Sequence, residues 1–249
     1  MTIGIVANRT KDCGLAYTKE VEAFLTARGV TIAPEGEKAD FWVVLGGDGT
    51  MLKAAKIAAN LDIPLLGINL GNMGFLTDGD KQDGFAIMEK ALKGEYEAHK
   101  RLMLTAGGGL ALNEAMVGKT AGALMDFSIY INGLKMDDIR ADGVIVATPT
   151  GSTAYSLSAG GPILAPYGQM IVITPICPHS LSTRPWVIPA EDRVHIVPGS
   201  KANLVLDGEL TVTITPNEGI EITRAPVSAT IMKTTTVPFY EILRKKKLL

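Results

Sequence analysis

The chain of 249 residues is long enough for one large domain or two modest ones. Its composition, 47% hydrophobic and 20% charged residues, is ordinary for a globular protein and excludes bulk disorder, collagen and low-complexity chains. The formal net charge of -2 argues against a nucleic-acid partner, because general nucleic-acid binding needs a clustered cationic surface.

The cysteines and the hydropathy of the chain indicate the cellular compartment in which the protein works. The two cysteines, Cys13 and Cys177, are far apart and form neither a CxxC pair nor a metal-ligand spacing, so no disulfide framework or zinc site is indicated. No apolar run approaches the ~18 residues that span a bilayer, and the amino terminus lacks the pattern of a signal peptide. We therefore expect a soluble protein of the reducing cytoplasm, with no membrane partner.

The first part of the chain predicts repeated strand-helix units. Apolar runs read as buried strands, two of them are stopped by glycine-rich turns, and apolar residues then recur at the spacing of one helix face. The expected strands are residues 2–7, 41–45 and 64–69, and the expected helices carry Tyr17 to Leu25, Met51 to Ala59 and residues 82–92. Such units favour a parallel sheet covered by helices.

Past about residue 97 the pattern becomes mostly β. Short β-rich runs at 126–131, 143–147 and 170–174 are separated by glycine, proline and asparagine. Strict alternation from Thr211 to Thr215 places Val212 and Ile214 on one buried face. Near the end, Phe239, Ile242 and Leu243 predict a short terminal helix, whose basic run at 244–247 is typical of a solvated helix end.

The most informative turn lies between the second strand and its helix. Gly46, Gly47 and Gly49 allow backbone N–H groups to approach an anion, and the helix start beyond them carries a partial positive charge. Such a turn suits a polyphosphate, although it is neither a Walker A loop nor the GxGxxG fingerprint. Lys53, in the first helical turn, could swing back toward a bound phosphate or simply face solvent.

Asp48 is the unusual member of this turn. A carboxylate beside a phosphate is repelled unless a cation lies between them or the carboxylate faces a hydroxyl. The position therefore suits a metal-linked or proton-accepting role. The alternative is a turn aspartate that bonds its own backbone.

Two further stretches carry clustered polar groups. Residues 142–162 read as a strand followed by a loop dense in hydroxyls and small residues, which suits a highly polar ligand or, alternatively, loops that cap their own turns. Asn113-Glu114 follows an expected strand end and could bind ribose hydroxyls or amide edges. His179 has no second ligand or nucleophilic serine elbow beside it, so we expect a structural, loop-anchoring part for it.

Taken in order, five stretches of the chain resemble the NAD kinase family. The GGDGT turn alone is shared with diacylglycerol kinases, sphingosine kinases and phosphofructokinases, whereas TPTGSTAYSLSAGGP is far more specific. The match spans most of the chain. The stretches are residues 46–50, residues 67–77 (GINLGNMGFLT), Leu112-Asn113-Glu114, residues 142–162 and residues 179–182 (HSLS).

The resemblance implies an α/β amino-terminal domain at 1–97, a β-rich NAD-binding domain at 98–237, and a final segment, 238–249, that packs back on the first domain. It implies transfer of the γ-phosphoryl group of ATP to the 2′-hydroxyl of the adenosine ribose of NAD, giving NADP. ATP would act with a divalent cation, Mg²⁺, that takes no ligand directly from the protein. A homodimer or homotetramer is expected.

The resemblance also assigns roles to single residues. Asp48 becomes the proton acceptor, and Gly46, Gly47, Gly49, Thr50 and Lys53 serve the phosphates. The residues that match NAD-binding positions are Phe75 and Leu76 at the adenine, Asn113, Glu114, Thr153, Ala154, Tyr155, Ser156 and Ser158 along the dinucleotide, and Arg140 and Asp142 across a subunit interface.

The sequence departs from the family pattern at one position, and it leaves two alternative functions open. Bacterial relatives often have glutamine where this chain has Glu209, and a carboxylate there loses a donor and adds charge. Ligand contact at Glu209 is therefore doubtful. A lipid kinase that shares the turn would present an apolar or membrane-facing patch, and a non-catalytic NAD or ATP sensor would bind through the same loops without forming product.

Overall fold

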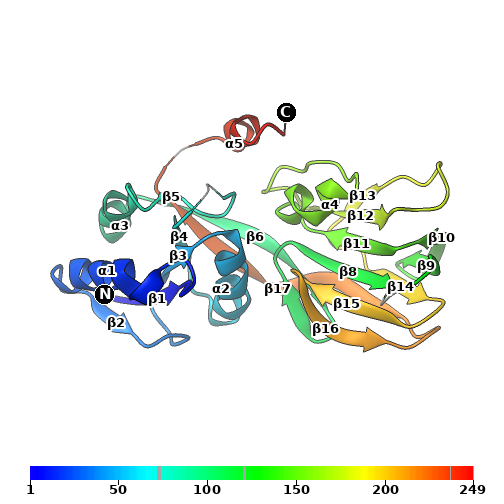
Figure 1. Cartoon of the computed structure of the whole chain (residues 1–249), viewed down its shortest axis with the longest axis horizontal. Coiled ribbons are helices and arrows are strands. Elements are labelled where there is room, and N and C mark those ends of the chain that lie inside the picture. Colours follow the sequence, from blue (N-terminus) through cyan, green and yellow to red (C-terminus); the bar gives the residue numbers. More distant parts are fainter. Residues whose placement is uncertain (72–73, 120–121, 236, 249) are drawn as a thin grey trace. The chain divides into compact units, whose positions relative to one another are not determined.

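The computed structural model describes residues 1–71, 74–119, 122–235 and 237–248. Asn72 and Met73 of the predicted 67–77 motif, and Leu249 of the predicted final segment, lie outside the described residues. The chain forms two compact units: unit 1 is Met1–Arg101 with Val227–Leu249, and unit 2 is Leu102–Pro226. Unit 2 is therefore an insertion in the sequence of unit 1 (Figure 1).

Unit 1 is built on parallel strands with helices between them. The neighbouring strands run in the order β17, β4, β3, β1, β2, and every pair among them is parallel, as predicted. The elements are β1 (Thr2–Ala7), η1 (Cys13–Leu15), α1 (Ala16–Thr26), β2 (Thr31–Ala33), β3 (Phe41–Gly46), α2 (Asp48–Leu61), β4 (Leu65–Asn69), β5 (Gly79–Asp80), α3 (Gly84–Leu92), the start of β6 (Glu97–Ala106), the end of β17 (Ile220–Lys233) and α5 (Phe239–Lys245).

The helices cover this sheet because alternate strand residues are apolar on both faces. One core cluster joins Val21 and Leu25 of α1 and Met88 of α3 to Val43 and Ile68. Helix α2 packs on the opposite face, since Met51 lies against Gly67, which alternates with Ile68 along β4. A side chain at position 67 would force the Met51 side chain to shift, so glycine gives α2 room to pack closely on β4.

Unit 2 is a β-sandwich, which agrees with the predicted β-rich second domain. One sheet contains β10, β9, β14 and the start of β17, and the other runs in the order β13, β12, β11, β8, β15, β16. The elements are the end of β6, β7 (Gly109–Ala111), β8 (Glu114–Lys119), β9 (Met125–Ile131), β10 (Leu134–Ala141), β11 (Gly143–Ala147), η2 (Gly151–Thr153), α4 (Tyr155–Ser158), β12 (Met170–Ile176), β13 (Trp186–Pro189), β14 (Val194–Pro198), β15 (Ala202–Leu206) and β16 (Glu209–Ile214).

The core of unit 2 lies between its two sheets. Phe127 and Val194 come from one sheet, Val144 and Leu204 from the other, and all four side chains are fully buried in one cluster. Burying such a side chain contributes about 1.5–3 kcal/mol, so this cluster is the main source of the unit's stability.

One prediction about this unit was wrong. Ile214 is buried, but Val212 is 40% exposed. The reason is its strand: β16 forms the edge of its sheet and pairs with β15 alone, and a register shift interrupts that pairing beside Val212. Alternation in sequence fixes which face a residue occupies, and it does not say whether another layer covers that face at the edge.

Candidate active site

The loops that follow β1 and β3 lie at the topological switch point of the unit 1 sheet. Strand β1 connects through α1 to β2 on one side, whereas β3 lies on its other side and leads on to β4. In sheets of this kind ligands bind in the crevice beyond the carboxyl ends of the two strands that flank the switch. Residues 46–50 lie at this place.

The glycine turn forms the open start of α2. Gly47 is the N-cap residue and no side chain caps the helix, whose first turn includes Asp48. A Cβ at Gly46 would collide with the Thr50 side chain, so glycine is required there. The Thr50 hydroxyl accepts a 3.1 Å hydrogen bond from Asn8 Nδ2. The start of this 14-residue helix therefore has no side-chain cap, and its dipole favours an anion there.

The Asp48 carboxylate is held by backbone N–H groups of a distant loop. Phe75 N donates to Oδ2 at 2.9 Å, and Leu76 N donates to Oδ1 at 3.0 Å. The absence of a side chain at Gly74 makes this possible, because a Cβ there would overlap the carboxylate. Asp48 therefore does not bond its own turn as an ordinary turn aspartate does, and each oxygen keeps a lone pair for a further donor.

The segment that holds Asp48 is itself tied to the end of β17. Asp78 accepts hydrogen bonds from Thr234 N and Oγ1 and from Thr235 Oγ1. Lys233 Nζ donates to the carbonyl oxygen of Thr77 at 2.6 Å. Burial lowers the pKa of Lys233 to about 8, a shift that the nearby Asp78 opposes and Arg101 reinforces.

Arg101 adds a second buried cation to unit 1. It is 7% exposed, and its Nε has no hydrogen-bond partner among the described residues. Burial lowers the pKa of this guanidinium. The Asp48 carboxylate also acts electrostatically on Lys233, so the predicted catalytic aspartate shares its surroundings with buried positive charge.

The two predicted adenine-packing residues differ in exposure. Leu76 is buried, whereas Phe75 is half-buried. The Phe75 ring lies 6.3 Å from that of Phe239, and the Lys246 ammonium lies 4.8 Å from the centre of the Phe75 ring. Lys53 is exposed on α2.

In unit 2 the two predicted NAD-binding motifs lie together. Thr148 N donates to Asn113 O at 2.8 Å, and Thr148 Oγ1 donates to Leu112 O at 2.6 Å. A Cβ at Gly151 would collide with the Asn113 backbone, so glycine allows the loop to lie flat on the Asn113-Glu114 pair. The Glu114 side chain is buried, and Asn113 is half-buried.

Asp207 fixes this pair, and the sequence pattern did not single it out. Its carboxylate accepts the backbone N–H groups of Leu112, Asn113 and Glu114 at 2.9, 2.8 and 3.1 Å. Asp207 has a φ of 51° and Gly208 a φ of 80°, so a tight turn between β15 and β16 presents the carboxylate. The Asp-Gly dipeptide was the available indication, and it predicts a turn rather than a partner. Glu209 is exposed.

The predicted NAD-binding residues of the hydroxyl-rich loop differ from one another in burial. The Ser156 side chain is buried and lies 2.9 Å from Thr174 Oγ1, so it holds the loop to β12. Thr153 Oγ1 donates to Thr150 O at 3.1 Å. Tyr155 is 44% exposed, Ser158 is exposed and Ala154 is half-buried, so these three reach the surface of unit 2.

The two residues predicted to act across an interface lie at the end of β10. Arg140 is exposed, and Asp142 forms an ion pair with Lys119 of the same chain. The backbone N–H of His179 donates to Arg140 O at 2.8 Å. The 178–182 loop is therefore anchored to β10 through the His179 backbone.

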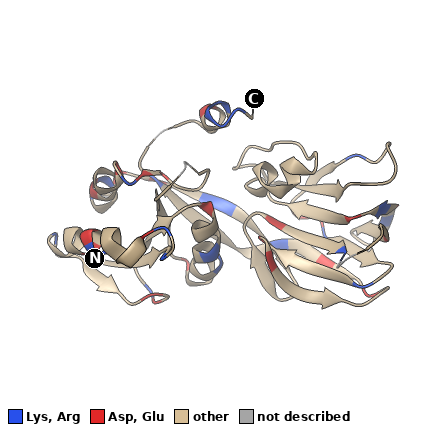
Figure 2. Ribbon diagram, in the orientation of Figure 1, with Lys and Arg blue, Asp and Glu red and all other residues tan. Residues whose placement is uncertain are grey.

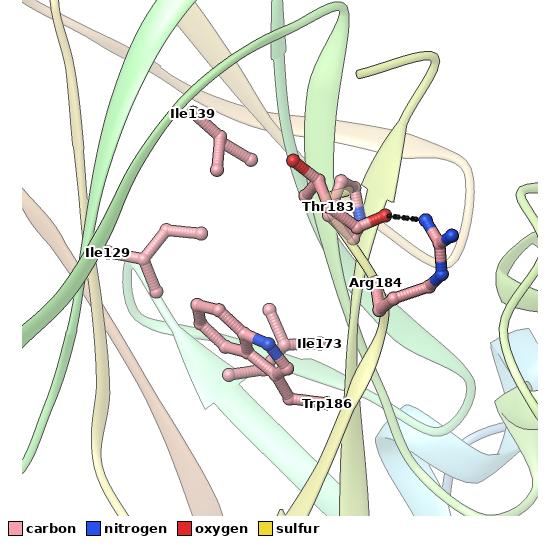
Figure 3. A pocket seen from close by; sticks show the side chains of 7 residues that line it. Ile129, Ile139, Ile173, Thr183, Arg184 and Trp186 are labelled. Carbon is pink, nitrogen blue, oxygen red and sulfur yellow. Dashed lines mark hydrogen bonds between the residues drawn. The ribbon is translucent and has the colours of Figure 1, made fainter. Parts of the chain in front are cut away.

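An apolar hollow in unit 2 is separate from these residues (Figure 3). Its walls include Ile129, Ile139, Ile173 and Trp186. The one charged group at its rim, Arg184, donates to the carbonyl oxygens of Leu181 and Thr183. The walls are mostly hydrocarbon and the Arg184 guanidinium is already hydrogen-bonded within its own loop, so we do not assign the candidate site to this hollow.

Acidic and basic residues are interspersed over both units (Figure 2). The described residues contain no group of three or more histidine, cysteine, aspartate or glutamate side chains that could hold a metal ion. None of the helices in the described ranges combines the length and apolar character needed to cross a bilayer.

The fold and these two groups of residues define a two-domain nucleotide-binding protein. Unit 1 supplies an open helix start at a switch point with a carboxylate in its first turn, and unit 2 supplies a polar loop packed on an Asn-Glu pair. Comparison with known proteins gives the particular family.

The model of the ATP-NAD kinase N-terminal domain matches residues 27–96, and that of the ATP-NAD kinase C-terminal domain matches residues 112–234. The NAD kinase of Moorella thermoacetica is 36% identical over 98% of this chain and 88% of its own length. That of Tolumonas auensis is 40% identical over 85% and 77%. The chain belongs to the NAD kinase family and is an enzyme that phosphorylates NAD.

Solved structures agree with this assignment. The NAD kinase of Archaeoglobus fulgidus, in complex with ATP, has a TM-score of 0.86 at 29% identity and covers all of both chains. The yeast NADH kinase complexed with NADH has a TM-score of 0.86 at 24% identity, covering 98% of this chain and 86% of its own, and shows the shared fold. Membership of this family decides against the lipid kinase and the non-catalytic sensor.

Proposed function

We propose that Asp48 is the proton acceptor in the transfer of the γ-phosphoryl group of ATP to the 2′-hydroxyl of the adenosine ribose of NAD. The hydroxyl proton passes to the Asp48 carboxylate as the ribose oxygen bonds to the γ-phosphorus. The bond from that phosphorus to the β–γ bridging oxygen breaks, and ADP leaves. Alignment and charge neutralisation dominate such transfers, so Asp48 needs accurate placement above all.

The observation that carries this proposal is the double hydrogen bond to Asp48. Phe75 N and Leu76 N fix the carboxylate in the first turn of α2, where an anion is favoured. An aspartate that only shapes its own turn would not need hydrogen bonds donated by a loop so far along the chain. The arrangement instead presents a carboxylate beside a phosphate site, which suits a hydroxyl that loses its proton.

The open start of α2 is the proposed phosphate site. Gly46, Gly47, Gly49 and Thr50 would meet the phosphates of ATP through backbone N–H groups and the Thr50 hydroxyl. Mg²⁺ usually keeps several waters and binds through substrate phosphates with few carboxylates, so the proposed cation is one carried mainly by ATP. When bound, it neutralises charge on the phosphates.

The proposed NAD-binding residues of unit 2 are Asn113, Glu114 and the loop that packs on them. A buried carboxylate and a neighbouring amide suit hydroxyl and amide groups of a dinucleotide. Thr153, Ala154, Tyr155 and Ser158 belong to the same proposed surface, with the buried Ser156 acting as its internal tie. Phe75 and Leu76 of unit 1 are the proposed adenine contacts.

One incubation tests the reaction. The purified chain, ATP, NAD and Mg²⁺ are mixed, and products are separated by chromatography and identified by mass. NADP phosphorylated at the 2′ position, with ADP in equal amount, is the expected result. Binding of both substrates without NADP would overturn the proposed chemistry.

We also propose that the chain forms a homodimer or homotetramer in which Arg140 and Asp142 reach the NAD of a neighbouring copy. Strand β10 is an edge strand of its sheet, and its Leu134 and Met136 are 68% and 46% exposed. An edge with exposed apolar side chains favours pairing with another copy. Analytical ultracentrifugation of wild type and of the double variant Leu134→Glu, Met136→Glu tests this: the variant should dissociate, and a monomeric wild type would refute association.

The proposed location is the cytoplasm. Cys13 and Cys177 are both free and exposed, a state that a reducing compartment maintains. Fractionation of cells that express the tagged chain measures this directly, and recovery in the cytoplasmic fraction is expected.

A further inference from the structure

The loop after β1 is fixed against the glycine turn by a single asparagine. Asn8 N donates to Leu45 O at 2.8 Å, and Asn8 Nδ2 donates to Thr50 Oγ1 at 3.1 Å. The Asn8 side-chain oxygen accepts the N–H groups of Thr10 and Lys11, each at 3.1 Å. The backbone of Lys11 is therefore held in a defined turn beside the start of α2.

The Lys11 ammonium lies between two glycines of separate loops. A Cβ at Gly47 would be 2.8 Å from Lys11 Nζ, and a Cβ at Gly71 would be 3.4 Å from it. A side chain at position 47 would displace the ammonium, so glycine leaves room for this cation. The Asn69 side-chain oxygen lies 3.9 Å from each of those two points, so Lys11 lies where the loops after β1, β3 and β4 meet.

The charge of Lys11 is not explained by the fold. No carboxylate pairs with its ammonium in the described part of the chain. A cation at a helix N-terminus is also disfavoured by the helix dipole. Fixed positive charge added to an already positive helix start is an unfavourable arrangement without a ligand, and it becomes favourable when an anion binds.

We propose that Lys11 binds the polyphosphate of the phosphoryl donor at the start of α2. This inference rests on the proposed function of the glycine turn and adds a residue that sequence motifs do not assign. Lys11 takes the part that the sequence had suggested for Lys53, which is exposed further along α2. A lysine acts here as a compact point charge that meets phosphate oxygens.

Kinetics of lysine variants test the proposal. We expect Lys11→Met to raise the KM for ATP about tenfold or more, as expected for the loss of one hydrogen bond to a charged group, and to leave the KM for NAD within about twofold. Lys11→Arg retains the charge and should recover most of the ATP affinity. Lys19→Met, an equivalent change at an exposed lysine of α1, serves as the matched control and should behave as wild type.

Direct binding of inorganic tripolyphosphate, measured by calorimetry, separates charge recognition from recognition of the nucleoside. Lys11→Met should weaken tripolyphosphate and ATP binding by similar factors. Unchanged ATP and tripolyphosphate affinity in Lys11→Met, or a loss that appears in Lys53→Met instead, would overturn the inference. Weakened ATP binding with intact tripolyphosphate binding would also overturn it.

The two proposals fail in distinguishable ways. A wild-type protein that forms no NADP contradicts the proposed function whatever Lys11 does. A wild-type protein that forms NADP, with Lys11→Met unchanged in its KM for ATP, leaves that function intact and contradicts only the role of Lys11. Equal thermal unfolding midpoints for wild type, Lys11→Met and Lys11→Arg exclude misfolding as the cause of any loss.

Discussion

Lys233 donates a 2.6 Å hydrogen bond to the carbonyl oxygen of Thr77. The same short segment carries Phe75 and Leu76, whose N–H groups bind Asp48. The end of β17 therefore supports the loop that orients the proposed proton acceptor. This support includes a buried ammonium, whose charge makes the stability of unit 1 sensitive to pH.

Stability should rise with pH between about 8 and 10 because of Lys233. Burial lowers its pKa to about 8 from an ordinary 10.5, so above pH 8 the unfolded chain holds a proton that the folded chain has released. Below pH 8 both states are charged, and the penalty of the buried ammonium is fully present. Relative to Lys233→Met, the free energy of unfolding of wild type should rise by about 2 kcal/mol across this window.

Urea unfolding at a series of pH values measures this difference. Tyr17, whose pKa burial raises to about 12, gives each protein the opposite slope above pH 10, but it is present in both proteins. Groups common to both proteins cancel in the difference. Parallel pH profiles for wild type and Lys233→Met would show that Lys233 stays charged in the folded protein.

Replacing Asp48 by asparagine should remove the proton acceptor while keeping its shape. We expect turnover to fall by ~10²-fold or more, in the range of general-base contributions, with much of the NAD affinity retained. The amide group introduced by Asp48→Asn can accept only one of the two N–H groups that the carboxylate accepts, so unfolding should also become easier by about 1 kcal/mol. Steady-state rates, NAD calorimetry and thermal unfolding measure the three effects, and unchanged turnover would remove Asp48 from its role.

Gly74→Ala tests the placement of Asp48 without changing its chemistry. The added methyl group would overlap the carboxylate, so Asp48 must move away from Phe75 N and Leu76 N. We expect kcat to fall about tenfold or more, because small displacements of a reacting group cost large factors in rate. Gly199→Ala is the control, since a Cβ there makes only an ordinary 3.4 Å contact. Normal kcat in Gly74→Ala would mean that Asp48 tolerates displacement.

Asp207→Ala should affect NAD and not ATP. The change leaves the N–H groups of Leu112, Asn113 and Glu114 without their acceptor, so the Asn113-Glu114 pair loses its fixed geometry. Leaving buried donors unsatisfied costs about 1–3 kcal/mol each. We expect a lower thermal midpoint and a KM for NAD raised about tenfold, with the KM for ATP unchanged. Glu209→Gln, at an exposed position of the same turn, should change neither KM; equal increases in both KM values for Asp207→Ala would argue for general unfolding.

The elements with strong local patterns could be predicted from sequence. Strand β1 was expected at residues 2–7 and is Thr2–Ala7, and β11 was expected at 143–147 and is Gly143–Ala147. Both are short runs made up mostly of apolar residues, and each is followed by a polar residue, Asn8 or Thr148. The three-residue strand β2 was not predicted, because Thr31–Ala33 is too short to show a period.

The supporting contacts of the site could not be predicted in the same way. Asp48 and Asn113 belong to recognisable motifs, whereas Lys233 and Asp207 are separated by long stretches of chain from the groups they bind. Such contacts depend on sheet order, which local patterns do not encode. The limits between the two domains are equally hard to read from sequence. We expected them between residues 97 and 98 and between residues 237 and 238, whereas the two compact units divide inside β6 and β17. Each of these strands continues from one unit into the other, so no turn marks the limit.

The insertion of unit 2 within unit 1 has a consequence for how the protein is made. On the ribosome, residues 46–50 and 74–78 emerge early, but Lys233, Thr234 and Thr235 emerge only after the whole of unit 2 has been synthesised. The pairing of Leu65 with Ile231 must wait equally long. A nascent chain that ends at Pro226 thus carries every residue of the glycine turn but none of the hydrogen bonds by which residues 233–235 brace Thr77 and Asp78, so we expect phosphoryl transfer only after those residues have been synthesised.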